Sequence, residues 1–136
     1  MVQLNPYLSF KGNCREAMSF YKECFGGELS IMTFGDSPVA DQMPADKRDH
    51  VMHSDLKAKD GLVLMASDAS PEELQKGNTV TLALICSSED EIRTLFSHLS
   101  TDGEVGQPLE TAFWGGIFGT LTDKFGVKWM FNYEKK

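Results

Sequence analysis

The chain is poor in cysteine and short of positive charge. Its three cysteines, Cys14, Cys24 and Cys86, are an odd number without a CxxC pair, which argues against a disulfide framework or a zinc knuckle and predicts reduced thiols. The 13 Lys and Arg residues are outnumbered by 20 Asp and Glu, so the formal net charge is −7. Because nucleic-acid binding relies on clustered basic side chains, we expect no DNA or RNA partner.

Membrane and targeting signals are lacking too. No apolar stretch approaches the roughly 20 residues of a membrane span, and the N-terminus lacks the basic-then-apolar pattern of a secretory signal. We therefore expect no membrane association and a cytoplasmic protein. The GxGxxG, GxxxxGK[ST] and GxSxG motifs are also missing, so no nucleotide cofactor, and no cofactor of any kind, is expected.

What the chain does have is an internal repeat. A shift of 75 residues places one apolar helical stripe on another: Ala17, Phe20, Tyr21 and Cys24 fall on Ile92, Leu95, Phe96 and Leu99. A shift of 65 places Leu56–Met65 on Leu121–Met130. The first copy therefore carries extra residues, which we assign to a loop over Ser37–Asp49. The repeat predicts a duplicated module.

Periodicity predicts the elements of each copy. Asn13 and Ser88, each followed three residues later by Glu, are expected to cap two helices, and Gly26-Gly27 is expected to end the first. The predicted helices are 15–25 and 89–99, and the predicted strands are 4–10, 29–34, 51–57, 62–67, 79–86, 106–110, 117–122 and 127–133. We expect one domain over 1–136, built from module 1 (about 1–70), a linker (71–78) and module 2 (about 79–136).

Four stretches carry a resemblance to a known family. They are PYLSFKGNCREAMSFYKECFGGEL (Pro6–Leu29), MHSDL (Met52–Leu56), LMASDA (Leu64–Ala69) and FWGGIFGTLTDKFGVKWMFN (Phe113–Asn132). Together they resemble the PhnB-like branch of the vicinal-oxygen-chelate superfamily of glyoxalases, bleomycin-resistance proteins and dioxygenases. The resemblance implies an α+β fold, in which two βαβββ modules form a curved mixed sheet around a cup, and a homodimer. Members of this branch mostly lack an assigned reaction, so enzymatic activity is left open.

The resemblance also bears on metal binding. Metal-dependent members of the superfamily take His, Gln or Glu ligands from the opening and closing strands of each module, positions that fall here on Asn5, Met65, Thr81 and Met130. Two thioethers, an amide and a hydroxyl bind divalent ions poorly. We therefore expect no inherited metal site.

Side chains that face the cup follow from strand alternation. If Trp129 and Phe131 are buried against a helix, then Lys128, Met130 and Asn132 face the other way. Met65 and Met130 would make a soft apolar floor, although methionine also serves simply to fill gaps. Trp114, on a glycine-flanked loop, is either an aromatic lid or an interface anchor. The expected ligand-binding residues are Asn5, Tyr7, Met65, Thr81, Trp114, Lys128 and Met130.

His53 and Asp55 are the candidates for catalysis. Two positions apart on one strand, their side chains emerge on the same face, where the carboxylate can orient the imidazole as a general base. The alternative is a structural histidine beside an exposed carboxylate. Cys14, at a helix start, is a weaker candidate nucleophile, because no base lies near it in the sequence.

These observations favour a metal-free, dimeric protein whose cup binds a small organic molecule and acts on it weakly, if at all, through His53 and Asp55. One alternative is a lyase or dioxygenase-type enzyme with a metal centre rebuilt from His50, His53 and Asp55. Another is a structural or protein-binding module whose cup has collapsed.

Overall fold

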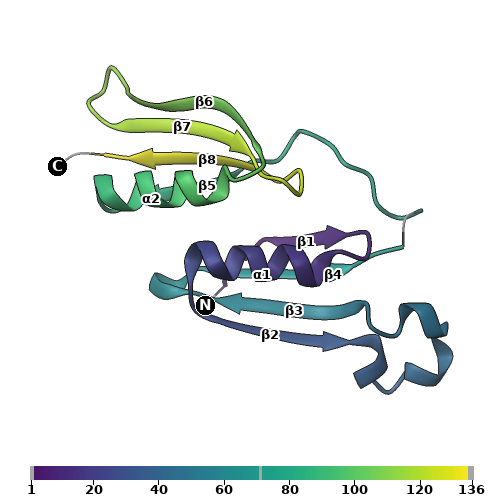
Figure 1. Ribbon diagram of the computed structural model, residues 1–136. Coiled ribbons are helices and arrows are strands. Elements are labelled where there is room, and N and C mark those ends of the chain that lie inside the picture. The colour runs from purple at the N-terminus through teal and green to yellow at the C-terminus, as the bar shows by residue number, and fades with distance from the viewer. Residues whose placement is uncertain (1, 71, 135–136) are drawn as a thin grey trace. The chain divides into compact units, whose positions relative to one another are not determined.

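The computed structural model describes residues 2–70 and 72–134, and it divides into two compact units, residues 1–76 and 77–136 (Figure 1). The boundary falls within the linker expected at 71–78. Residue 71 lies outside the described residues, and residues 72–78 contain no helix or strand.

In its described residues, 2–70 and 72–76, the first unit packs one α-helix on one sheet. Its elements are β1 (Tyr7–Phe10), α1 (Cys14–Phe25), β2 (Glu28–Thr33), β3 (Val51–Lys57) and β4 (Val63–Asp68). The sheet order is β1-β4-β3-β2, with β1 parallel to β4 and the other pairs antiparallel. Three short 3-10 turns occupy much of the segment between β2 and β3, which was expected to be a loop.

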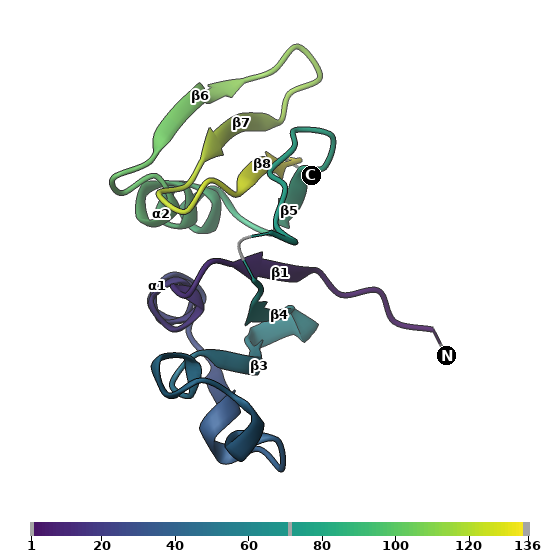
Figure 2. The same cartoon turned by 90° about the vertical axis from the view of Figure 1, so that its right-hand side faces the viewer.

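The second unit repeats this arrangement. Its elements are β5 (Leu82–Cys86), α2 (Glu89–Leu99), β6 (Glu104–Thr111), β7 (Ile117–Thr122) and β8 (Lys128–Tyr133), and its sheet order is β5-β8-β7-β6. Figure 2 shows that each helix lies against its own sheet. The predicted α+β fold of two βαβββ modules is confirmed.

The opening strands are shorter than predicted. β1 begins at Tyr7 rather than at Leu4, which is 96% exposed instead of packed on the core. Pro6 directly precedes the strand and has no backbone N–H to donate to the hydrogen-bond ladder of the sheet. β5 begins at Leu82, which pairs with Trp129, and because β8 itself starts at Lys128, residues before Thr81 have no partner strand.

The two helix starts are capped differently. Ser88 accepts a hydrogen bond from the Glu91 amide (3.1 Å), as expected, although the Glu91 carboxylate accepts from Ser87. The expectation for Asn13 is wrong, because its side chain makes no cap hydrogen bond. The buried Asp68 carboxylate at the end of β4 accepts from the Cys14 amide instead (3.0 Å), so a strand closes this helix end.

The core of each unit lies between its helix and one face of its sheet. In the second unit Trp129 is 2% exposed and Phe131 is fully buried, with the Phe131 ring 5.1 Å from that of Phe96 on α2. The alternation predicted for β8 therefore holds. The buried Asp123 carboxylate accepts a hydrogen bond from the Trp129 indole (2.8 Å) and fixes the turn before β8. The opposite face of each sheet is free of its own helix and carries the candidate sites.

No helix in the described parts of the chain is long and apolar enough to cross a membrane.

Candidate functional site

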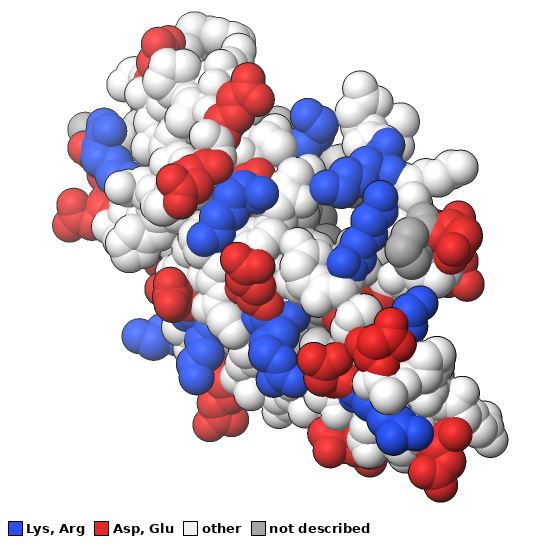
Figure 3. Space-filling view, turned by 45° about the vertical axis from the view of Figure 1, so that its right-hand side comes forward, with Lys and Arg blue, Asp and Glu red and all other residues white. Residues whose placement is uncertain are grey.

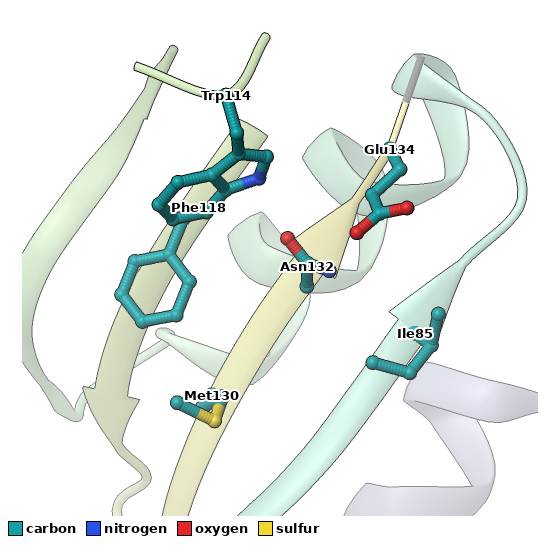
Figure 4. Close-up of a pocket in the computed structure, with 6 residues that line it drawn as sticks. All are labelled: Ile85, Trp114, Phe118, Met130, Asn132 and Glu134. Carbon is teal, nitrogen blue, oxygen red and sulfur yellow. The ribbon is translucent and has the colours of Figure 1, made fainter. Parts of the chain in front are cut away.

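A pocket of about 470 Å³ opens on the face of the second sheet opposite α2. Strand pairing aligns three side chains across this face, because Asn132 on β8 pairs with Phe118 on β7 and with Ile85 on β5. Figure 4 shows Phe118 and Trp114 on one side of β8 and Ile85 on the other. The lining residues are Ile85, Trp114, Phe118, Met130, Asn132 and Glu134.

The aromatic wall comes from the loop between β6 and β7. The Ala112 amide donates to the Gly116 carbonyl and the Gly115 amide donates to the Ala112 carbonyl, which closes this loop; it turns at Gly115, whose φ of 89° suits glycine. Trp114 projects from it and meets Phe118 edge to face, with ring centroids 6.3 Å apart. Trp114 is 49% exposed, so part of the indole is available to a ligand.

Asn132 is the polar group at the base of this pocket. Its Oδ1 atom is buried and has no hydrogen-bond partner among the described residues. In Figure 4 this oxygen points toward the side of the pocket formed by Trp114 and Phe118. A buried acceptor without a partner costs about 1 to 3 kcal/mol, which a ligand with a suitably placed donor would recover.

The first unit carries a polar cluster on its own open sheet face. The hydroxyl of Tyr7 on β1 lies 3.3 Å from Nδ1 of His53 on β3. The other ring nitrogen, Nε2, lies 3.8 Å from a carboxylate oxygen of Asp55. Strand alternation pairs His53 with Asp55 but connects neither residue with Tyr7.

The residues expected to bind a ligand are distributed over both units. Met130 and Trp114 line the pocket, whereas Lys128 and Thr81 are not among its lining residues. In the first unit, the Asn5 amide nitrogen lies 4.0 Å from the Met65 sulfur. Thr81 is exposed and lies just before β5.

Three lining residues, Ile85, Phe118 and Glu134, are not among the ligand-binding residues expected from the sequence. Phe118 could have been found from alternation, because its neighbours Ile117 and Gly119 are both buried on the helix side. The place of Ile85 depends on its pairing with Asn132, which only the parallel register of β5 and β8 reveals.

The donor atoms do not fit a divalent metal ion. The positions that the resemblance assigns to metal ligands carry Asn5 and Met65 in the first unit and Thr81 and Met130 in the second, with no carboxylate or imidazole among them. The described residues contain no group of three or more His, Cys, Asp or Glu side chains that could hold a metal. His50 does not complete such a group with His53 and Asp55, because its ring lies against the turn at Gly12.

Two cysteines are buried thiols. Burial raises the pKa of Cys14 to about 11 from its ordinary value of 9.0, and it does the same for Cys86. The Cys14 sulfur lies 3.6 Å from the Ser54 hydroxyl and has no exposed area. Since the thiolate is the reactive form, Cys14 is not suited to be a nucleophile.

Fold and sequence together identify the class of protein. The sequence model of the Glyoxalase/Bleomycin resistance protein/Dioxygenase superfamily matches residues 3–131, and the chain belongs to this superfamily. Protein YjdN of Escherichia coli (strain K12) is 34% identical over 99% of this chain and 97% of its own.

Solved structures place the chain near the same relatives. Protein PA1353 from Pseudomonas aeruginosa is 42% identical, with all of both chains covered and a TM-score of 0.86. The PhnB protein from Bacillus cereus is 28% identical over 97% of this chain and 99% of its own, with a TM-score of 0.74. The fosfomycin resistance protein FosX from Listeria monocytogenes, at 13% identity, 99% and 94% coverage and a TM-score of 0.66, shows the shared fold alone.

Proposed function

We propose that the pocket of the second unit binds a small, flat, largely apolar organic molecule that carries a hydrogen-bond donor. The observation that carries this proposal is the buried, unpartnered Asn132 Oδ1 in a pocket of about 470 Å³. That volume lies within the range of about 300 to 1,000 Å³ that is usual for small-molecule sites.

The chemistry of the lining supports this ligand class. Trp114 and Phe118 offer aromatic surface for a flat ring, and the flexible Met130 thioether adapts to ligands of imperfect fit. The two oxygen-bearing side chains, Asn132 and Glu134, supply acceptors. An amine or amide N–H on an aromatic ring satisfies both requirements better than a carboxylate, which Glu134 would repel.

A matched ligand panel tests the proposal. Bicyclic aromatic amines, the parent hydrocarbons and the corresponding carboxylates are compared by thermal shift and by NMR titration. We expect the amines to raise the melting temperature most, because binding to the folded state stabilises it. The proposal fails if no amine binds to a protein that NMR shows to be folded.

Variants locate the binding site. Replacing Asn132 with Leu keeps the branched side-chain shape but removes the acceptor, so affinity for the amine should fall at least about fivefold. Thr122→Val is the matched control, because Thr122 lies on the neighbouring strand but does not line the pocket. Equal losses in both variants would contradict a specific role for Asn132.

The same experiments separate the two alternatives. A stoichiometric divalent ion in protein purified without chelators would favour the metal-dependent enzyme. A folded protein that binds neither a metal nor any member of the panel would favour a structural or protein-binding module.

A further inference from the structure

The open face of the first sheet joins three side chains into one chain of contacts. In the order β1-β4-β3, Tyr7 pairs with Met65 and Met65 pairs with Asp55, so Tyr7 lies two strands away from β3. Its phenol bridges this separation, with ring centroids 5.8 Å apart for Tyr7 and His53. The pocket of the second unit uses none of these residues.

The two nitrogens of His53 face groups of opposite character. Nε2 faces the Asp55 carboxylate, which favours a proton on that nitrogen. Nδ1 then keeps its lone pair and can accept the proton of the Tyr7 hydroxyl, 3.3 Å away. Carboxylate, imidazole and hydroxyl thus follow one another in the order that activates hydroxyl groups in hydrolase triads.

We propose that Tyr7 is the proton-accepting catalytic residue of a second site, which takes a small organic molecule bearing a hydroxyl or thiol group. As the Tyr7 proton passes to Nδ1 of His53, the phenolate oxygen removes the proton of the bound hydroxyl or thiol. The substrate becomes an oxyanion or thiolate, and His53 becomes an imidazolium that Asp55 stabilises. No oxidant or reductant is needed, and the reverse transfers restore the site.

The surroundings suit such a ligand. Tyr7 is 48% exposed, and the side chains of His53 and Asp55 are 39% and 28% exposed, so the group can be reached from solvent. Ser9 and Ser67 pair directly on β1 and β4 and add two hydroxyls to the same face. His53 and Asp55 act through Tyr7 and are therefore positioning residues.

Acetylation by p-nitrophenyl acetate tests the transfer of the Tyr7 proton to His53. The Tyr7 oxygen bonds to the acetyl carbon, the bond to p-nitrophenolate breaks, and the Tyr7 proton moves to His53. Peptide mass spectrometry then compares acetylation of Tyr7 with that of Tyr133. Near neutral pH we expect Tyr7 to react at least about tenfold faster.

Variants separate activation from simple exposure. His53→Gln should reduce the Tyr7 rate to that of Tyr133, and free imidazole should restore the rate in His53→Gly. Asp55→Asn should slow acetylation, whereas Asp55→Glu should retain most of it. His98→Gln, at an exposed position on α2, is the matched control and should leave the rate unchanged.

Circular dichroism confirms that each variant is folded before its rate is used. Equal rates for Tyr7 and Tyr133, or an unchanged Tyr7 rate in folded His53→Gln, would overturn the proposal. The proposal does not depend on the pocket of the second unit, because none of Tyr7, His53 and Asp55 lines it.

Discussion

Cys14 shows how a residue's surroundings override its place in the sequence. A cysteine in the first turn of a helix is exposed to the positive end of the helix dipole, which lowers a thiol pKa. Here the side chain is completely buried, and the loss of solvent raises the pKa to about 11. Burial therefore changes the pKa of Cys14 more than the helix dipole does, and the protonated thiol contributes to the stability of the fold.

This pKa shift predicts a pH dependence of stability. The unfolded thiol loses its proton near 9.0 and the folded one near 11, so between these values the folded state binds more protons. The stability contributed by the Cys14 thiol is therefore complete below pH 9 and is lost between about pH 9 and 11. The loss is at most about 2 to 3 kcal/mol.

Urea denaturation at a series of pH values measures this effect. The fall in unfolding free energy above pH 9 should be smaller in Cys14→Ala than in the wild type. Cys24→Ser, at a less buried position, serves as the control and should keep the wild-type slope. Identical slopes in all three proteins would show that the Cys14 thiol does not contribute.

The candidate sites could be predicted only in part, for reasons that are visible at single residues. Alternation along β8 was enough to predict that the Met130 and Asn132 side chains point away from the core. Alternation could not predict the contact between Tyr7 and His53, because that contact depends on β4 lying between β1 and β3. Nor could it find Asp68 at the start of α1, since carboxylate and helix are 54 residues apart.

At the scale of elements, both modules share a close approach between strands. A Cβ atom on Gly27, just before β2, would lie 2.2 Å from the Lys57 carbonyl oxygen at the end of β3. A Cβ on Gly103, just before β6, would lie 2.5 Å from the carbonyl oxygen of Thr122 at the end of β7. The repeat thus preserves a backbone contact that only glycine allows.

Gly27→Ala should be strongly destabilising. The new methyl group would meet backbone atoms that cannot move aside, and φ is 94°, where side chains add about 1 to 2 kcal/mol of strain. We expect a loss well above 2 kcal/mol in urea denaturation.

Gly26→Ala is the matched control, because it has the same sign of φ (73°) but no atom within 4 Å of a Cβ. It should show the conformational strain alone. A Gly27→Ala protein no less stable than Gly26→Ala would contradict the close approach.

The existence of the elements was easier to predict than their ends. In the part of the chain that the structure describes, helical and alternating apolar patterns identified both α-helices and all eight strands. The ends of the strands depend on pairing with neighbouring strands, so the predicted β1 and β5 are too long. β6 came out too short, since Glu104–Thr111 contains two irregularities in its pairing with β7 that break the alternation.

At the scale of the whole molecule, charge is not gathered by sign on the face drawn in Figure 3. Acidic and basic side chains lie interspersed there despite the net charge of −7. Such a face does not create the extended single-sign field that steers highly charged partners. A small, mostly uncharged ligand is in keeping with this distribution.

We expect the protein to be a homodimer, as the family resemblance implies. Phe113 is 98% exposed and stacks edge to face on Trp114 at 5.0 Å, an arrangement that leaves apolar surface in water. Light scattering should give twice the mass of one chain. Phe113→Ser should shift this toward the monomer, whereas Val39→Ser should not; a monomeric wild type would contradict the expectation.

The pairing of each module's first strand with its last has a consequence for synthesis on the ribosome. Among the described strands β1 pairs with β4 alone, so a nascent chain cannot close the first sheet until Asp68 has left the exit tunnel. At that point β5 (Leu82–Cys86) has been translated but still lies inside the tunnel, so the second sheet cannot yet form. We expect the N-terminal half to acquire its sheet as a separate cotranslational step, with Tyr7 and His53 brought together before Asn132 exists.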